Sequence, residues 1–457
     1  MIRAKIGVIG AGSIVWSAKL ICDLCLTESL GGSVVSLMDK NRERLKIIHS
    51  FARRYASEVK ADLKFEKTMD RREAIRDADF VINTAMAGGH QYYEKMRKVS
   101  ERHGYYRGIN SVEWNMVSDY HTIWGYYQFK LMLDIARDIE DLSPDAWLLM
   151  PANPVFEGTT LISRETKAKI IGLCHGHLGY KEMAKILGLD LKDVEVLLVG
   201  FNHLIWMTKF KYKGEDAYPL LDEWIEKNAE RYWRAWRRKQ KNPFDIQMSP
   251  AAVDMYRTYG LFPIGDTVRG GTWKYHWNLK TKKRWFGPTG GPDSEIGWRI
   301  YLESHEKRLK RSIEAIRDRT VPLTKLVPPE KSEESVVPII NSILNDEEAT
   351  YQVNIPNKGA INGIPDDVVV EVPAKIDGKG IHRVQIGSLP KRLMNYVIYP
   401  RMTRMEWALE AFIEGGRDLL FEWLIVDART RSTRQVERVI DTILSLPENE
   451  EMAKHFT

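Results

Sequence analysis

Two predicted strands each lead into a side chain that can bind a metal ion. The apolar run at residues 169–173 leads into Cys174, and the run at 194–199 is followed by His203. Ligands of open parallel sheets bind at the carboxyl ends of the strands, so these two side chains could meet there. A thiolate and an imidazole, with positions left open for substrate oxygens, suit Mn²⁺, Fe²⁺, Co²⁺ or Ni²⁺. Two ligands are fewer than the four of a structural zinc site. Strand-end residues buried without a metal are the alternative.

The N-terminus has the pattern of a dinucleotide-binding βαβ unit. An apolar run at residues 5–9 leads into Gly10, Gly12 and Ser13, and a second run at 34–38 ends at Asp39. The glycines would allow a tight turn and a close approach of the pyrophosphate to a helix N-terminus, and the acid would bind the ribose hydroxyls of NAD. Because Val15 replaces the third glycine, an ordinary glycine turn is the alternative.

The surrounding elements support this reading. Strand-like segments at residues 4–9, 34–38, 80–84, 147–150, 169–173 and 194–199 alternate with amphipathic helices at 13–28, 41–58, 120–140 and 180–187. This alternation predicts an α/β fold with a Rossmann-like, doubly wound parallel sheet. Asn83 and Thr84, which end the third of these strands, are expected beside the cofactor.

From about residue 205 the pattern changes. Charged helices at 220–240 and 296–317, a β-rich piece at 351–373 and helices at 401–414 and 433–445 predict an α+β substrate domain. We therefore expect an NAD-binding domain at 1–203 and a substrate-binding and oligomerisation domain at 204–457, with the active site between them. The polar, proline-bearing stretch at 326–336 is the most linker-like.

Composition excludes several classes of protein. The 457 residues are 44% hydrophobic and 28% charged, which is typical of a soluble globular protein, and no run is long enough to span a membrane. The net charge of +6 is modest, and the basic, aromatic run at 227–241 fits an amphipathic surface helix better than a nucleic-acid site. Three cysteines are too few for a disulfide framework, and no signal peptide precedes the first strand, so we expect a cytoplasmic protein.

Motifs along essentially the whole chain resemble those of glycoside hydrolase family 4. They are GAGS at 10–13, NSVEWNMVSDY at 110–120, ANP at 152–154, CHGH at 174–177, FNH at 201–203, MYRTYGLFPIGDTVR at 255–269, NIPNKG at 354–359 and DDVVVEVP at 366–373. This resemblance implies hydrolysis of a glycoside with recycled NAD⁺ and a divalent metal such as Mn²⁺. The sugar is oxidised at C3 and deprotonated at C2, the C1 substituent is eliminated, water adds, and hydride returns to C3.

The resemblance also implies roles for individual residues. Cys174 and His203 correspond to the metal ligands and His175 to the general acid. Asp266 corresponds to the proton acceptor, with Tyr256 as a rival base.

Three further residues correspond to substrate contacts. Asn153 and Asp119 would bind sugar hydroxyls. Arg269 is the candidate for an anionic sugar group, because a guanidinium fork suits a carboxylate. A turn at Asn153-Pro154 and a salt bridge at Arg269 are the plain structural alternatives.

The residue after the predicted metal cysteine bears on the substrate. Phosphosugar-cleaving members of the family carry Asn or Asp there, whereas this chain carries His175. We therefore expect an unphosphorylated α-glucoside, with an α-glucuronide, an α-galacturonide or an α-galactoside as alternatives. A 2-hydroxyacid-type dehydrogenase and an NAD-binding protein without activity are more distant alternatives. A homodimer or tetramer is expected from base rates.

Overall fold

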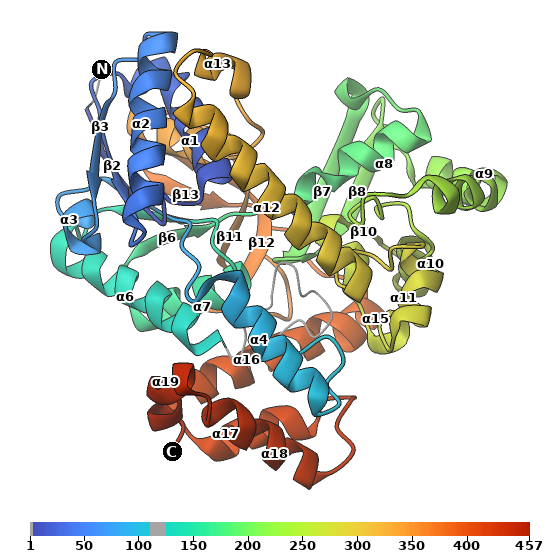
Figure 1. Ribbon diagram of the computed structural model, residues 1–457. Helices are drawn as coiled ribbons and strands as arrows, with labels where there is room; N and C mark the ends of the chain where they lie inside the picture. Colours follow the sequence, from blue (N-terminus) through green and yellow to red (C-terminus); the bar gives the residue numbers. More distant parts are fainter. Residues whose placement is uncertain (1–2, 110–124) are drawn as a thin grey trace.

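Six parallel strands form one half of a large mixed sheet in the computed structural model, which describes residues 3–109 and 125–457 (Figure 1). Their order across the sheet is β6-β5-β4-β1-β2-β3. Their bounds are β1 Lys5–Ile9, β2 Val34–Met38, β3 Lys64–Thr68, β4 Phe80–Asn83, β5 Trp147–Met150 and β6 Lys169–Gly172. This is the order of a doubly wound dinucleotide-binding sheet, in which the strand order reverses between β1 and β4. It confirms the predicted fold class.

The sheet continues beyond β6 with antiparallel strands, in the order β6-β11-β12-β7-β8-β10. Their bounds are β7 Val194–Phe201, β8 Leu204–Tyr212, β9 Glu215–Asp216, β10 Phe262–Ile264, β11 Ala349–Pro356, β12 Val369–Asp377 and β13 Gly380–Arg383. The β11–β12 hairpin therefore lies between β6 and β7, although it comes much later in the sequence. One sheet runs across the boundary expected at residue 203.

The parallel strands are buried against helices on both faces of the sheet. Ile6 and Val8 of β1 belong to one buried cluster, which includes residues of α1 (Ile14–Cys25) and α2 (Arg42–Val59). Ile9 belongs to a second cluster with residues of α3 (Arg71–Ile75) and α6 (Tyr126–Leu142). Neighbouring residues of a strand point to opposite faces, so a strand buried on both faces must be apolar throughout.

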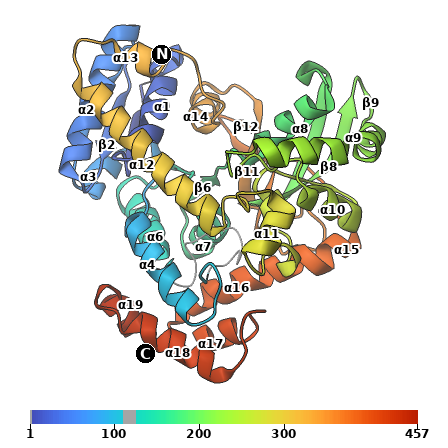
Figure 2. The same cartoon turned by 45° about the vertical axis from the view of Figure 1, so that its right-hand side comes forward.

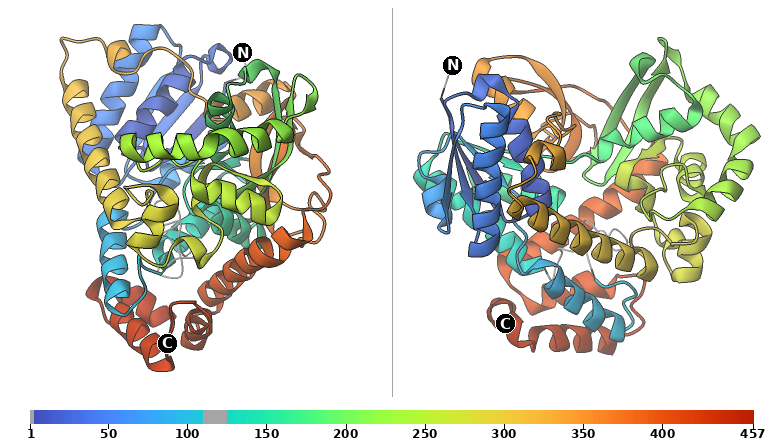
Figure 3. Two further views of the ribbon diagram at one scale, coloured as in Figure 1. Left: turned by 90° about the vertical axis from the view of Figure 1, so that its right-hand side faces the viewer. Right: turned by 45° about the horizontal axis from the view of Figure 1, so that its top comes forward.

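The remaining helices surround this sheet. In chain order they are α4 Gly89–Arg102, α7 Val155–Glu165, α8 Gly179–Leu187, α9 Tyr218–Lys239, α10 Pro250–Tyr259, α11 Leu279–Phe286, α12 Glu295–Arg317, α13 Leu323–Leu326, α14 Val336–Asn345, α15 Lys391–Leu393, α16 Tyr399–Glu414, α17 Arg417–Ile425, α18 Thr433–Leu444 and α19 Glu450–His455. Figure 2 shows α12 running from the α1–α2 layer towards α11. Figure 3 shows the C-terminal helices α16 to α18 grouped at one end of the molecule.

The stretch at residues 326–336 is tied to the nucleotide-binding half. It joins α13 to α14, and the backbone N–H of Ser332 donates to Asp23 Oδ1 of α1 at 2.6 Å. Cys22 Sγ lies 3.6 Å from the carbonyl oxygens of Pro328 and Glu330. A polar, proline-bearing composition predicted a linker, whereas the stretch is a strap held along α1.

Among the described residues, no helix is long and apolar enough to cross a membrane.

Candidate active site

The loop after β6 presents Cys174 and His175. The Cys174 side chain is half-buried, and its Sγ accepts the backbone N–H of Gly176 at 3.3 Å. His177 Nδ1 lies 3.0 Å from the carbonyl oxygen of Cys174, which ties the loop back on itself. A cysteine side chain binds a metal ion through its sulfur, as the thiolate.

The tight turn between β7 and β8 presents His203. This residue is buried and has a φ of 59°, in the left-handed region that non-glycine residues seldom occupy. Its Nε2 lies 3.3 Å from Oδ2 of Asp266, which follows β10. Cys174 also lies close to Asp266. A Cβ placed on Gly176 would lie 3.5 Å from Cys174 Sγ and 3.9 Å from the backbone N of Asp266. The structure therefore gathers the predicted cysteine, histidine and aspartate.

Asp266 is held by a buried arginine. Arg269 Nε donates to Asp266 Oδ1 at 3.0 Å, and Arg269 Nη1 donates to both carboxylate oxygens of Asp293 at 2.9 Å. Burial alone would raise the pKa of Asp266, but the charges of Arg269 and His203 outweigh it and lower the pKa to about 2. Asp266 is therefore ionised throughout the ordinary pH range.

His175 is paired with a carboxylate that sequence reasoning missed. Its Nδ1 lies 3.3 Å from Oε1 of Glu334, which is part of the strap. The hydrogen bond to Glu334 is the main reason why the pKa of His175 is raised to about 9, although water screens this exposed side chain in part. The ring is thus held by Nδ1, which leaves Nε2 to face a substrate. Nothing in the polar composition of residues 326–336 marked Glu334 as part of a site.

The donor set fits a divalent transition metal with an incomplete protein shell. Among the described residues, no group of three or more His, Cys, Asp or Glu side chains is arranged to hold a metal ion. If Cys174 and His203 supply two ligands, water or substrate oxygens would occupy the positions that these two residues leave open. A soft thiolate with an imidazole suits such an ion better than Mg²⁺ or Ca²⁺.

The glycine-rich turn fits a dinucleotide. Gly10 has a φ of 87°, and a Cβ there would lie 2.7 Å from the backbone of Ala85. The backbone N–H of Gly12 donates to Asp39 Oδ2 at 2.8 Å, which places the carboxylate at the turn. Ser13 precedes α1, and its side chain makes no capping hydrogen bond to the helix N-terminus. The N–H groups of a helix N-terminus can bind phosphate.

The end of β4 lies beside this turn. The Thr84 hydroxyl donates to the carbonyl oxygens of Ile9 and Gly10 at 3.1 Å, and Asn83 Oδ1 accepts the N–H of Ala85 at 3.0 Å. Asn83 Nδ2 is buried and has no hydrogen-bond partner among the described residues. A buried amide donor of this kind fits a polar ligand at the strand ends.

The other predicted residues differ in their placement. The Tyr256 hydroxyl donates to Asp222 at 2.9 Å, and its ring stacks on Tyr218, so the structure engages it outside the cluster around Asp266. Asn153 precedes Pro154 through a cis peptide bond, and its buried Oδ1 has no partner among the described residues. Asp119 lies outside the described residues.

Comparisons with known proteins test the resemblance inferred from the motifs. A family model described as family 4 glycosyl hydrolase matches residues 5–189, and a model of that family's C-terminal domain matches residues 198–430. The chain belongs to glycosyl hydrolase family 4. This result confirms the resemblance.

Curated relatives in the family act on different sugars according to their names. An α-galactosidase of Bacillus subtilis is 26% identical over 95% of both chains. An α-galacturonidase of Thermoanaerobacter italicus is 26% identical over 93% of this chain and 92% of its own. An α-glucosidase of Erwinia rhapontici is 26% identical over 96% and 97%.

Solved structures agree with the family 4 fold. A 6-phospho-α-glucosidase from gut microorganisms, described as a complex with NAD and Mn²⁺, has a TM-score of 0.77 at 18% identity and covers 99% of both chains. A 6-phospho-β-glucosidase from Thermotoga maritima, described with manganese, NAD⁺ and glucose-6-phosphate, has a TM-score of 0.73 at 21% identity over 99% of both chains. At these identities the likeness concerns the fold.

Proposed function

We propose that this family 4 member is an α-glycosidase acting on unphosphorylated α-glycosides, first of all α-glucosides, with NAD⁺ and a divalent metal ion such as Mn²⁺. The observation that carries the proposal is the gathering of Cys174, His175, His203 and Asp266 at one edge of a dinucleotide-type sheet. The names of the three curated relatives reported above support an unphosphorylated sugar.

The two cofactors would supply the parts of the chemistry that side chains cannot. Bound NAD⁺ would supply hydride transfer at C3, and a bound metal ion would supply Lewis-acid stabilisation of the sugar oxygens. Gly10, Gly12 and Asp39 would hold the dinucleotide, and Cys174 and His203 would hold the metal ion.

The residues of this chain supply the proton transfers. His175 would donate a proton from Nε2 to the departing glycosidic oxygen, while Glu334 holds the ring through Nδ1. Asp266 would accept the C2 proton. Its carboxylate is ionised, as a base must be, but its low pKa makes it a weak base, so the proton must be acidified by the C3 ketone before transfer.

An α-uronide is the second candidate substrate, and buried cationic groups favour it. Arg107 is buried, and its Nη2 has no partner among the described residues. Lys282 is 2% exposed, and its ammonium lies 3.0 Å from Nδ1 of His276. Arg107 Nε donates to the carbonyl oxygen of Asp293 at 3.0 Å, and the charge of Lys282 interacts with those of Asp293 and Arg269. A buried guanidinium N–H without a partner, such as Arg107 Nη2, suits a carboxylate on the sugar.

The first test is release of nitrophenol from the α-glucoside, the α-glucuronide, the α-galacturonide and the α-galactoside. NAD⁺, Mn²⁺ and thiol are each omitted in turn, after bound cofactor has been removed. Loss of turnover on each omission supports the proposal, and the preferred sugar decides between the candidates. Turnover that does not need NAD⁺ and metal would overturn the mechanism.

The assembly and location of the protein remain predictions from the sequence. We expect a cytoplasmic homodimer or tetramer, with a small glycoside as the partner and no role in nucleic-acid or membrane binding. Light scattering during size-exclusion chromatography measures the oligomeric state directly.

A further inference from the structure

A row of four residues crosses the sheet between the two strands that carry the predicted metal ligands. Gly172 of β6 pairs with Asn354 of β11, Asn354 pairs with Glu371 of β12, and Glu371 pairs with Gly200 of β7. Gly172 lies two residues before Cys174, and Gly200 lies three before His203. The two polar side chains of the row therefore stand between the two halves of the candidate metal site.

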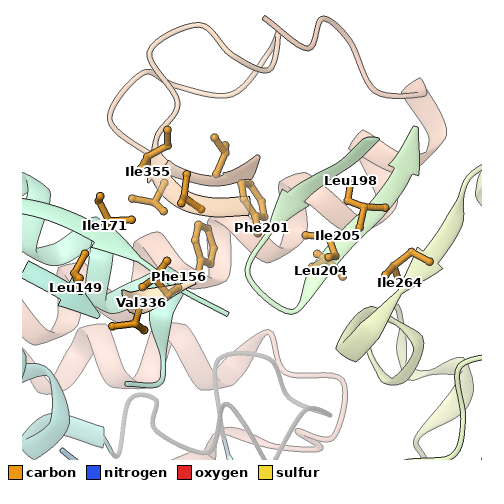
Figure 4. Packing of buried hydrophobic residues seen from close by; sticks show 14 of the residues in the cluster. Leu149, Phe156, Ile171, Leu198, Phe201, Leu204, Ile205, Ile264, Val336 and Ile355 are labelled. Carbon is orange, nitrogen blue, oxygen red and sulfur yellow. The ribbon is translucent and has the colours of Figure 1, made fainter. Parts of the chain in front are cut away.

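Neither glycine adds a side chain to this row, and space is short on the β6 side. A Cβ on Gly172 would lie 2.5 Å from Thr159 Oγ1 and 2.9 Å from Asn354 Cβ. The chain neighbours of the two polar residues are buried and apolar (Val353, Ile355, Val370 and Val372), and the Phe156 and Phe201 rings stack at 4.4 Å in the same buried cluster (Figure 4). The polar pair is thus enclosed within a hydrophobic part of the sheet.

Glu371 is the acidic member of the row, and it is 1% exposed. Its Oε2 accepts a hydrogen bond from Nδ2 of Asn202 at 3.0 Å, and Asn202 is 2% exposed. Glu371 Oε1 has no well-aligned hydrogen-bond partner among the described residues. Burial of a carboxyl group with so few partners costs stability, which natural proteins tolerate mainly where the group serves a purpose.

Asn202 links this carboxyl group to His203. Asn202 and His203 are the two turn residues between β7, which ends at Phe201, and β8, which begins at Leu204. His203 occupies the left-handed region, so its backbone needs support from its surroundings. The hydrogen bond from Asn202 to Glu371 therefore ties the residue that precedes His203 to the neighbouring strand β12.

We propose that Glu371 is a positioning residue of the metal site, which holds the Asn202–His203 turn so that the His203 imidazole faces Cys174. This inference rests on the proposed function, because it presupposes that Cys174 and His203 bind the metal ion. The second-layer groups around metal ligands typically change metal affinity by about 10–100-fold when they are removed.

The experiment measures binding of Mn²⁺ alone to the reduced, full-length protein by electron paramagnetic resonance of free Mn²⁺. The variants are Glu371→Met, which keeps the volume and loses the acceptor, and Glu371→Gln, which keeps an acceptor oxygen for Asn202. Glu157→Gln is the matched control, because Glu157 is also a fully buried glutamate and pairs with Arg401 rather than with the turn. Thermal unfolding without metal is recorded for each protein.

We expect Glu371→Met to lower Mn²⁺ affinity about 10–100-fold with little change in the unfolding temperature. Glu371→Gln should bind Mn²⁺ within about 3-fold of wild type. Glu157→Gln should keep wild-type affinity even where its unfolding temperature falls.

Other outcomes overturn the inference. Wild-type affinity in Glu371→Met shows that Glu371 does not position the ligand, as does an equal loss of affinity in the Glu157→Gln control. Should Glu371→Met fail to fold, Asn202→Ala replaces it, with the same expected loss and the same contradiction. A wild-type protein that binds neither Mn²⁺ nor Co²⁺ nor Ni²⁺ refutes the metal site itself, and the proposed function fails with it.

Discussion

The guanidinium of Arg269 lies 2.9 and 3.0 Å from Oδ1 of Asp266, and the same side chain also binds Asp293. Arg269 is 2% exposed and Asp293 3% exposed, so this is a buried ion-pair group. Its main effect is to fix the carboxylate of Asp266 beside His203. Removal of one partner from such a group leaves a buried charge without compensation.

Arg269→Met should therefore lower the free energy of unfolding by about 3–5 kcal/mol, because Asp293 and Asp266 lose their cation. Urea denaturation at pH 7 measures this change. The double variant Arg269→Met/Asp293→Asn should recover part of the loss, since it removes one of the two stranded charges. Equal stabilities of wild type and the single variant would contradict this account of the pairing.

The Glu334–His175 contact predicts a dependence on the leaving group. Glu334→Gln should slow cleavage of an alkyl α-glycoside about 10-fold or more, because an alkoxide needs proton donation as it departs. Cleavage of the nitrophenyl α-glycoside should change far less, since nitrophenolate leaves without an acid. Steady-state kcat/KM for the two substrates measures the difference. A uniform loss on both would instead indicate a general disturbance of the site.

The predicted thiolate ligand can be tested by oxidation and by substitution. Cys174→Ser should lose nearly all Mn²⁺-dependent activity, because serine is not ionised at neutral pH. Wild type should lose activity in dilute peroxide and regain it with a thiol reductant. Cys22 and Cys25 are buried, so double replacement of both by alanine provides the control and should leave this sensitivity intact.

Asp39 predicts the choice of dinucleotide. Asp39→Ala should weaken NAD⁺ binding about 10-fold or more and reduce the discrimination against NADP⁺, because we expect this carboxylate to bind the ribose hydroxyls and to repel a 2′-phosphate. Isothermal titration with each dinucleotide measures both affinities. Unchanged preference for NAD⁺ in the variant would remove Asp39 from the cofactor site.

Lys282 predicts how stability varies with pH. Burial lowers the pKa of its ammonium to about 8. The unfolded chain therefore holds this proton more tightly than the folded one between about pH 8 and 10.5, so stability rises with pH in that window. Between pH 7.5 and 9.5 the free energy of unfolding of wild type should rise by about 1–2 kcal/mol relative to Lys282→Gln. Parallel curves for the two proteins would contradict the burial argument.

The parallel half of the fold was predictable because each strand is a short apolar run between amphipathic helices. All six strands expected within residues 1–203 are present, with ends that differ by two residues at most, but the last of them, β7, is antiparallel to both of its neighbours. β3 was missed, since its exposed face makes Lys64–Thr68 largely polar. The insertion of β11 and β12 between β6 and β7 could not be predicted, because a local pattern contains no information on which distant strands pair.

The candidate site shows the same division. Cys174 and His203 were predictable because each follows an apolar strand. The reason why they meet was not, since β6 and β7 run in opposite directions and are brought end to end by β11 and β12. Glu334 was not predictable, since nothing in the sequence distinguishes it from the other acidic residues of this polar stretch or indicates that it contacts His175. Glu371 did carry a signal, a lone acid within the apolar run 368–372, which indicates a buried carboxyl group.

The β11–β12 hairpin lies between β6 and β7 but comes much later in the sequence, which affects how the protein folds during translation. Cys174 and His203 leave the ribosome well before residues 349–377, which must take their place between the strands that carry them. A nascent chain therefore contains both predicted ligands before it contains the hairpin that lies between their strands. We accordingly expect the metal ion to bind only after residues 349–377 have been synthesised and have joined the sheet.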